Sequence, residues 1–188
     1  MGREHTLRHD AVRNDLDLCV NAAGGVCHKE PSRLSSTGDK THPDLQMVIG
    51  GEQILVDVTI RHPTCPTYYA GKNGSANEQL RSTVIAEQQK TTKYSAMAEA
   101  QGAIFIPFAV ETYGGLGKSA KKLLQIISKA AQDQMLMYPY QRIVQNLRGQ
   151  IAISIQRGNA IAMLASYNRS IRGSVVRGRR AAAIAITA

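Results

Sequence analysis

The stretch HPDLQMVIGGEQILVDVTI, residues 42–60, decides the fold of this chain. Two apolar runs, 45–49 and 54–60, flank a pair of glycines, and β-branched residues on both sides of a glycine turn predict a β-hairpin. Successive side chains of a strand point to opposite faces, so Asp57 and Thr59 share one face of the second arm. Packing does not account for an aspartate among such apolar neighbours.

The segments around this hairpin predict an α/β fold, in which a single mixed sheet is flanked by helices. Hydrophobic periodicity, glycines and prolines place these segments. We expect helices over 6–23, 77–100, 118–134 and 140–166, strands over 26–30 and 103–110, and loops over 31–42 and 62–76. Two parts follow: a domain over residues 1–138, and a basic helical extension with a flexible tail over residues 139–188.

The charge of the chain predicts a polyanionic partner. The formal net charge is +9, and no acidic residue follows Asp133. An unopposed positive field attracts nucleic acid through counterion release. The arginines of this stretch are Arg142, Arg148, Arg157, Arg169, Arg172, Arg177, Arg179 and Arg180. For the last twenty residues a solvated face or a disordered basic tail remains an equal alternative.

Cysteine usage favours a reducing, intracellular compartment. The three cysteines, Cys19, Cys27 and Cys65, are an odd number at irregular spacing, which argues against a disulfide framework. Cys27-His28 and His62-x-x-Cys65 are possible mixed zinc ligands, but no second closely spaced pair of known type follows, so we favour a structural role without metal. No apolar run is long enough to span a membrane, and no membrane partner is expected.

Two aspartates of the hairpin predict a metal site. Asp44 opens the first arm and Asp57 lies inside the second, so a tight turn brings both carboxylates to one end of the hairpin. Mg²⁺ prefers oxygen ligands, usually one or two carboxylates with waters and phosphate. Such an ion can neutralise a phosphodiester and help ionise an attacking water. Each aspartate taken alone is more often a structural residue.

The helix over 77–100 offers a lysine for the same corner. A nearby lysine can stabilise charge that develops during phosphodiester hydrolysis. Lys90 and Tyr94 are four residues apart and share a helix face, whereas Lys93 is turned away from that direction by about 60°. We therefore prefer Lys90 and keep Lys93 as the second candidate.

Several segments together resemble the restriction-like endonuclease domain of non-LTR retrotransposon reverse transcriptases, within the PD-(D/E)XK nuclease superfamily. They are Arg8-His9-Asp10, Glu30-Pro31, His42-Pro43-Asp44-Leu45, Val56-Asp57-Val58-Thr59 and Lys90-x-x-Lys93-Tyr94. The resemblance covers roughly residues 8–115. Departures from the family pattern are Asp10 in place of an Asn-like residue, Thr59 where many relatives keep lysine, and a long insert before the lysine helix.

The resemblance implies a restriction-endonuclease-like mixed sheet with an α-β-β-β-α-β core, and an enzyme that nicks target DNA with Mg²⁺ or Mn²⁺ to expose a 3′ hydroxyl for reverse transcription. It implies DNA as partner, with a reverse transcriptase domain or RNA template nearby, and a nuclear location. The implied site consists of metal ligands Asp44 and Asp57, of Lys90, Lys93 and Tyr94 at the phosphate, and of residues that support the site or bind DNA: Arg8, His9, Asp10 and Glu30. Outside the resemblance, the basic residues Lys118, Arg142 and Arg148 are further candidates for DNA contact. Glu30 is either an additional ligand or a buried partner of a basic group.

Two other functions stay open. Residues 112–119, Thr-Tyr-Gly-Gly-Leu-Gly-Lys-Ser, nearly match a phosphate-binding P-loop between a strand and a helix. Thr112 replaces the first glycine of that motif, and no suitable second-strand acid follows, which disfavours a nucleotide-binding protein. The turn could still present a helix N-terminus to a DNA phosphate. The third reading is a catalytically inactive nucleic-acid-binding module, marked by salt-sensitive binding without cleavage.

Overall fold

The computed structural model describes residues 3–31, 42–70, 73–134 and 139–186, with side chains as far as residue 171. Its elements, in chain order, are α1 (Arg3–Ala22), β1 (Val26–Lys29), β2 (Leu45–Ile49), β3 (Glu52–Arg61), α2 (Pro66–Tyr69), α3 (Arg81–Ala100), β4 (Ile104–Glu111), α4 (Lys118–Gln134) and α5 (Tyr140–Ile186). The predicted α/β class and the α-β-β-β-α-β order of the core are confirmed, apart from one short extra helix.

The sheet is mixed and has the strand order β1-β2-β3-β4. Strands β1, β2 and β3 pair antiparallel, and Leu45 of β2 lies opposite Val56 of β3. Strand β4 pairs parallel to β3, with α3 as the crossover between them. The predicted hairpin is confirmed, and its register places the start of β2 beside the middle of β3.

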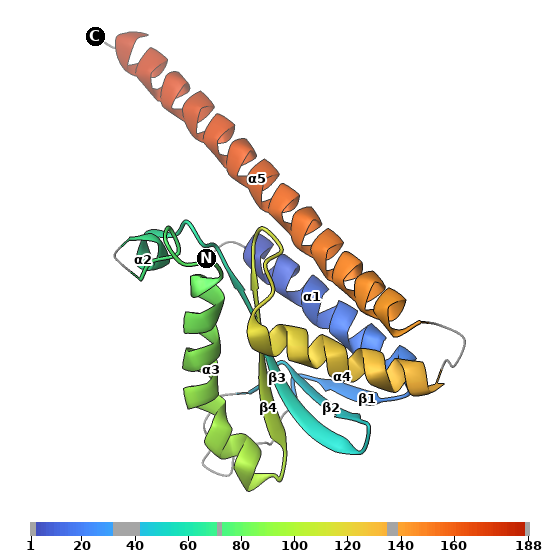
Figure 1. Ribbon diagram of the computed structural model, residues 1–188. Helices are drawn as coiled ribbons and strands as arrows, with labels where there is room; N and C mark the ends of the chain where they lie inside the picture. The colour runs from blue at the N-terminus through green and yellow to red at the C-terminus, as the bar shows by residue number, and fades with distance from the viewer. Residues whose placement is uncertain (1–2, 32–41, 71–72, 135–138, 187–188) are drawn as a thin grey trace.

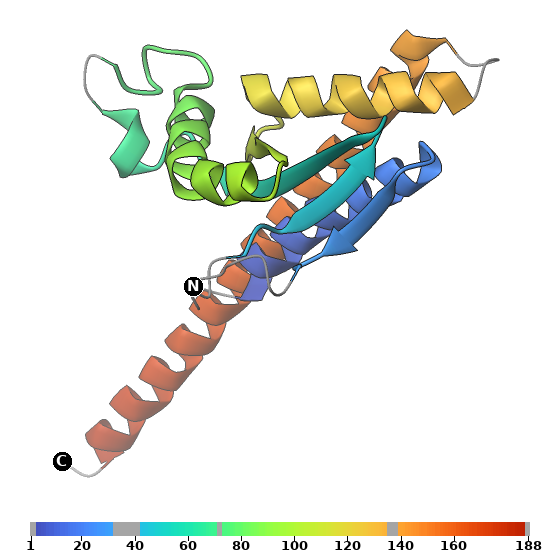
Figure 2. The same ribbon diagram turned by 90° about the horizontal axis from the view of Figure 1, so that it is seen from below.

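The helices cover the sheet unequally (Figures 1 and 2). On one face, alternate strand residues such as Met47, Val56 and Phe108 join the buried cluster formed with α1, α4 and the first part of α5. On the other face, α3 packs against β4 and β3. Beyond α3 this second face is open over β1 and β2, where Val26 and Val48 are 54% and 46% exposed. The site described below lies on this second face.

Helix α5 has 47 residues, about 70 Å at the usual rise, and extends far beyond the sheet (Figure 1). Its first part is held by Leu147, Ile151 and Ile155, which are nearly fully buried. A Cβ at Gly158 would lie 2.5 Å from Arg8 Cβ, so this glycine permits the close approach of α5 to α1. Among the described residues, no helix is sufficiently long and apolar to cross a bilayer.

Three differences from the expectations exceed a shift of one to three residues at an element's end. The segment 62–76, predicted as a loop, contains the single turn α2. Helix α3 begins at Arg81 instead of residue 77, directly after Leu80 with a left-handed φ of 61°. Helix α5 continues past the expected end at 166 and ends at Ile186. Of the predicted loop 31–42, residues 32–41 lie outside the described residues.

Candidate functional site

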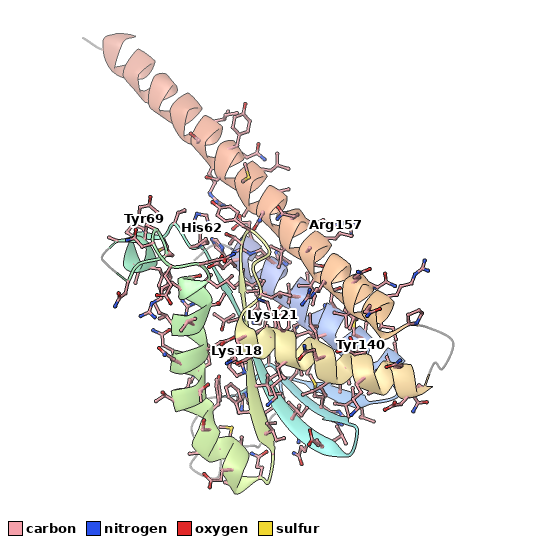
Figure 3. All side chains as sticks on the ribbon, in the orientation of Figure 1. His62, Tyr69, Lys118, Lys121, Tyr140 and Arg157 are labelled. Atoms are coloured by element: carbon pink, nitrogen blue, oxygen red, sulfur yellow. The ribbon has the colours of Figure 1, made fainter. Side chains whose placement is uncertain are left out.

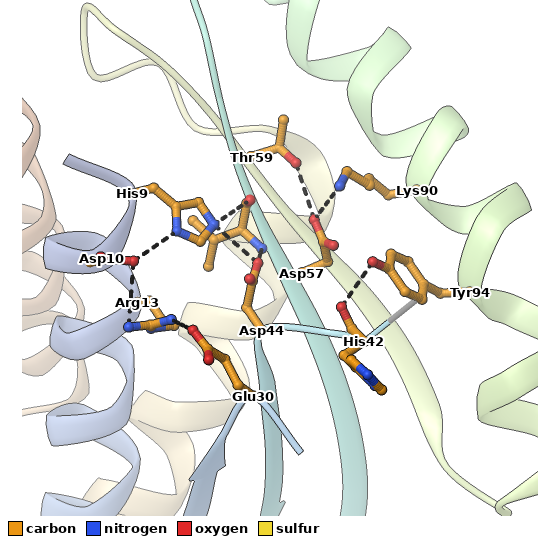
Figure 4. Close-up of polar contacts among 11 residues, drawn as sticks. His9, Asp10, Arg13, Glu30, His42, Asp44, Asp57, Thr59, Lys90 and Tyr94 are labelled. Atoms are coloured by element: carbon orange, nitrogen blue, oxygen red, sulfur yellow. Dashed lines mark hydrogen bonds and ion pairs between the residues drawn. The ribbon is translucent and has the colours of Figure 1, made fainter. Parts of the chain in front are cut away.

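Asp57 lies in the middle of β3 and is the most buried carboxylate of the site (Figure 4). Lys90 of α3 reaches across the sheet face, and its Nζ lies 2.8 Å from Asp57 Oδ2. The side chains of Asp57 and Lys90 are 5% and 24% exposed. The Thr59 hydroxyl donates to the same Oδ2 at 3.2 Å. A nearly buried carboxylate is thus paired and hydrogen-bonded, as burial of a charge requires.

Asp44 directly precedes β2 and is held against β3 (Figure 4). The Val58 N–H donates to Asp44 Oδ2 at 2.6 Å, which fixes this carboxylate beside the strand that carries Asp57. His9 Nε2 lies 3.1 Å from the same oxygen and 3.0 Å from the Val58 carbonyl oxygen. The hydrogen bond with Asp44 raises the pKa of His9, against the opposing effect of its burial.

A chain of polar contacts on α1 supports His9. Its Nδ1 lies 3.4 Å from Asp10 Oδ1, which in turn is 3.4 Å from an Arg13 nitrogen. Arg13 also pairs with Glu30, which follows β1 and is 70% exposed. Glu30 is therefore an exposed partner of a basic group, whereas the sequence suggested a metal ligand or a buried partner. These contacts tie α1 to the strands at the position of Asp44.

Tyr94 closes the site on the α3 side. It is 2% exposed, and its hydroxyl donates to the His42 carbonyl oxygen at 3.0 Å. Burial, with the negative charge of Asp57 as the second cause, raises the pKa of Tyr94, so the phenol stays neutral. Lys93 Nζ lies 4.9 Å from the Tyr94 ring centroid, whereas Lys90 reaches Asp57. Lys90 Nζ also lies 5.8 Å from the Tyr94 ring centroid, so both lysines border this ring, and Lys90 pairs with Asp57 in addition.

The carboxylate oxygens of Asp44 and Asp57 are the type of ligand that a hard divalent cation such as Mg²⁺ prefers. Asp44 and Asp57 supply carboxylates from neighbouring strands, and Mg²⁺ usually takes one or two carboxylates and completes its shell with water and phosphate. Within the described part of the chain, no group of three or more His, Cys, Asp and Glu side chains is placed to hold a metal. A metal here would therefore rest on two carboxylates and non-protein oxygens.

Four residues of the expected site lie elsewhere. Arg8 is buried and donates to Asn159 Oδ1 of α5 at 2.6 Å, so it joins α1 to α5. Lys118 is exposed at the first turn of α4 (Figure 3). Arg142 and Arg148 are exposed on the part of α5 that packs with α1 and α4. Among the described residues, no contact joins these four side chains to Asp44 or Asp57.

The glycine turn before α4 is already occupied by a carboxylate of the protein. Glu87 Oε1 of α3 accepts a hydrogen bond from the Ser119 N–H at 2.8 Å. A Cβ added at Gly117 would collide with the same oxygen. In a P-loop these N–H groups face phosphate, whereas here they face Glu87, which disfavours nucleotide binding and a DNA phosphate at this helix end.

The zinc alternative finds no assembled ligand set among the described residues. His62 Nδ1 lies 2.8 Å from Thr112 Oγ1, and its Nε2 lies 2.8 Å from Thr64 Oγ1. All three cysteines are free thiols. Burial, then the negative charge of Asp17, raises the pKa of Cys27 to about 12.

Comparison with known proteins identifies a retrotransposon protein as similar to this chain. Over 168 residues, 87% of the chain, it is 27% identical to the Retrotransposable element SLACS 132 kDa protein of Trypanosoma brucei gambiense. The chain spans 14% of the length of that relative. No family model matches the chain. The likeness agrees with the relation to retrotransposons that the sequence motifs suggested.

Three participants were not among the predicted site residues. Arg13 has a detectable signal, because it lies four residues after His9 and three after Asp10, on the same helix face. Val58 and His42 contribute backbone atoms, and every residue type has these atoms, so the sequence does not reveal their role. Only the strand register and the packing of α3 place these backbone groups.

Proposed function

We propose that this protein is a metal-dependent DNA endonuclease that nicks target DNA for the insertion of a retrotransposon. The observation that carries the proposal is the register of β2 and β3, which brings Asp44 beside the segment of β3 that carries Asp57, where Lys90 of α3 pairs with Asp57. The 27% identical retrotransposon protein supports the biological context. DNA is then the substrate, a reverse transcriptase the functional neighbour, and the nucleus the place of action.

In this proposal, Asp44 and Asp57 hold Mg²⁺ or Mn²⁺, which when bound would neutralise the phosphate and lower the pKa of a water. Lys90 leaves its ion pair with Asp57 to contact the scissile phosphate and stabilise the charge that develops there. His9 holds Asp44 against β3, and Tyr94, kept neutral, orients the segment that precedes Asp44. Lys93 is not required.

The matched lysines allow a sharp test by plasmid nicking with Mg²⁺ or Mn²⁺ against EDTA. We expect Lys90→Met to lose about 100-fold or more in rate, the usual cost of one charge-stabilising group, and Asp57→Asn to be inactive. Lys93→Met on the same helix should stay within a few-fold of the parent. Asp17→Asn, which changes an aspartate paired with Lys29 outside the site, is the acidic control.

Two outcomes would overturn the proposal. Metal-dependent nicking that survives in Asp57→Asn would locate the activity elsewhere or in a contaminant. A parent protein that never cuts DNA of any form, with any divalent metal, would exclude the enzyme.

A catalytically inactive nucleic-acid-binding module is the second candidate. The observation that favours it is the Lys90–Asp57 ion pair, because a nearly buried carboxylate already neutralised by an ammonium has less need of a metal. Its signature is DNA binding that weakens steeply with salt and is unchanged by EDTA. The same preparations decide between the two candidates when binding is measured beside nicking.

A further inference from the structure

Helix α5 carries a second apolar face, whose side chains are exposed in the described part of the chain. The residues that anchor α5 recur at 147, 151, 155 and 158. A separate set, the outer stripe, is formed by Ile153, Ala160, Leu164, Tyr167 and Ile171. The 3.6-residue period puts the outer stripe roughly 160° around the helix from the anchor. From Ala160 onward the stripe residues are four, three and four positions apart, which is the spacing of the apolar residues in a coiled coil.

Apart from Ala160, the side chains of the outer stripe are large, and they are exposed. Ile153 is 53% exposed, Leu164 62% and Tyr167 63%, and Met163 beside them is 73% exposed. Scattered apolar residues on a surface are ordinary, but a contiguous row of this kind marks an interaction site. A helix without packing on its apolar face is also marginal in water, so the extended part of α5 gains from a partner.

The charges near the stripe favour a helix over a nucleic acid as partner. Between residues 153 and 171 the only charged residues are Arg157 and Arg169. Arg169 lies on the anchor side, where it pairs with Glu4 of α1 at 2.5 Å. Arg157 alone flanks the stripe, which is too little positive charge for a phosphate backbone along this face. The partner surface is therefore apolar and nearly uncharged.

The stripe is complementary to itself when reversed about residue 162. Antiparallel pairing brings Ile153 opposite Ile171 of a second copy, and the small Ala160 opposite the large Leu164. It also places Arg157 over the ring of Tyr167, a favourable cation–π arrangement. Parallel pairing would instead place the two Arg157 side chains side by side. A two-fold antiparallel contact repeats each of these pairs twice.

We propose that the protein forms an antiparallel dimer in which the outer stripe of α5 packs on the same stripe of a second copy. The contact is about 27 Å long, from the rise of an α-helix over residues 153–171. The stripe lies roughly opposite the anchor on α5, so a second copy approaches α5 from the side away from α1 and α4. This proposal is independent of the endonuclease activity.

Sedimentation velocity of the full chain tests the dimer. The parent should be dimeric at high micromolar concentration, and Leu164→Glu and Tyr167→Glu should be monomeric with unchanged circular dichroism. Leu18→Glu, at a 66% exposed leucine on α1, is the matched control and should remain dimeric. A parent that is monomeric at several hundred micromolar, or a dimer that survives both stripe variants, overturns the proposal.

Cysteine cross-linking tests the orientation in a background carrying Cys65→Ser. When the Ala160→Cys and Leu164→Cys variants are mixed, disulfides between the two should exceed those within either variant several-fold. A predominance of self-linked product would overturn the antiparallel arrangement. Loss of DNA retention by Leu164→Glu, with a monomeric parent, would assign the stripe to nucleic acid instead.

Discussion

Two glycines of α5 allow the packing of this helix on α1 to be tested with a matched pair of substitutions. Gly149 and Gly158 are both interior positions of α5, so replacement by alanine changes the intrinsic helix propensity equally. They differ in their surroundings. A Cβ at Gly149 meets nothing within 4 Å, whereas a Cβ at Gly158 would lie 2.5 Å from both Cβ and Cγ of Arg8.

The expected free energies follow from these distances. Alanine in place of glycine within a helix contributes about 1 kcal/mol, so Gly149→Ala should stabilise the protein by up to that amount. Carbon atoms ordinarily approach to about 3.5–4.0 Å, so at Gly158 the overlap with Arg8 is about 1 Å. Since Arg8 Cβ is fixed to the α1 backbone, the helices must separate, at a cost of about 1–3 kcal/mol. Gly158→Ala should thus be less stable than Gly149→Ala by about 1–3 kcal/mol.

Urea unfolding followed by circular dichroism measures this difference. In a chain of this size, it corresponds to a separation of roughly 2–12 °C between the melting temperatures of the two variants. The dependence of unfolding free energy on urea should be unchanged, because both variants expose the same surface on unfolding. Equal stability of Gly158→Ala and Gly149→Ala would refute the close approach of α5 to Arg8.

Three further predictions concern individual side chains. Lys90→Met should destabilise the protein by about 1–3 kcal/mol in urea, because it leaves the nearly buried Asp57 unpaired, whereas the exposed Lys93→Met should change stability by less than about 0.5 kcal/mol. Burial raises the pKa of Cys19 from 9.0 to about 12. Above pH 9 the unfolded chain therefore binds fewer protons than the folded protein, and the free energy of unfolding should fall as the pH rises toward 12. The urea concentration at the unfolding midpoint should therefore fall less between pH 9 and 12 in Cys19→Ala than in the parent. An equal fall in both proteins would show that Cys19 is not its cause. Glu87→Ala removes the carboxylate that accepts from the Ser119 N–H at the start of α4, and should cost about 1 kcal/mol in thermal unfolding.

Much of the fold could be predicted because its signals are local. The hairpin of β2 and β3 follows from two β-branched runs around a glycine turn, and α4 was expected over the same residues that form it. The start of α3 was not predicted, because residues 77–80 have helical composition while Leu80 adopts a left-handed conformation. The helix expected over 140–166 was confirmed with Gly158 inside it, at a close contact with Arg8, but its continuation to Ile186 was not predicted.

The candidate site could be predicted in part. The strand register that brings Asp44 to Val58 follows from the hairpin, so proximity of this carboxylate to Asp57 was expected from spacing alone. The partner of Arg8 could not be predicted, because Asn159 lies on a helix whose position depends on the whole core. The contact of Glu87 with the glycine turn before α4 could not be predicted either, because it depends on how α3 packs beside that turn.

The sequence by itself thus determined the hairpin, the mixed α/β order, and the faces shared by residues two apart in a strand or four apart in a helix. These follow from the periods of the strand and the helix, which act over a few residues. Only the tertiary structure decided that Lys90 contacts Asp57 while Lys93 lies against Tyr94. Which lysine contacts Asp57 depends on the rotation of α3 about its axis where it packs on the sheet, and α3 is joined to β3 through a long connection. Packing of distant elements sets this rotation, and it has no counterpart in local periodicity.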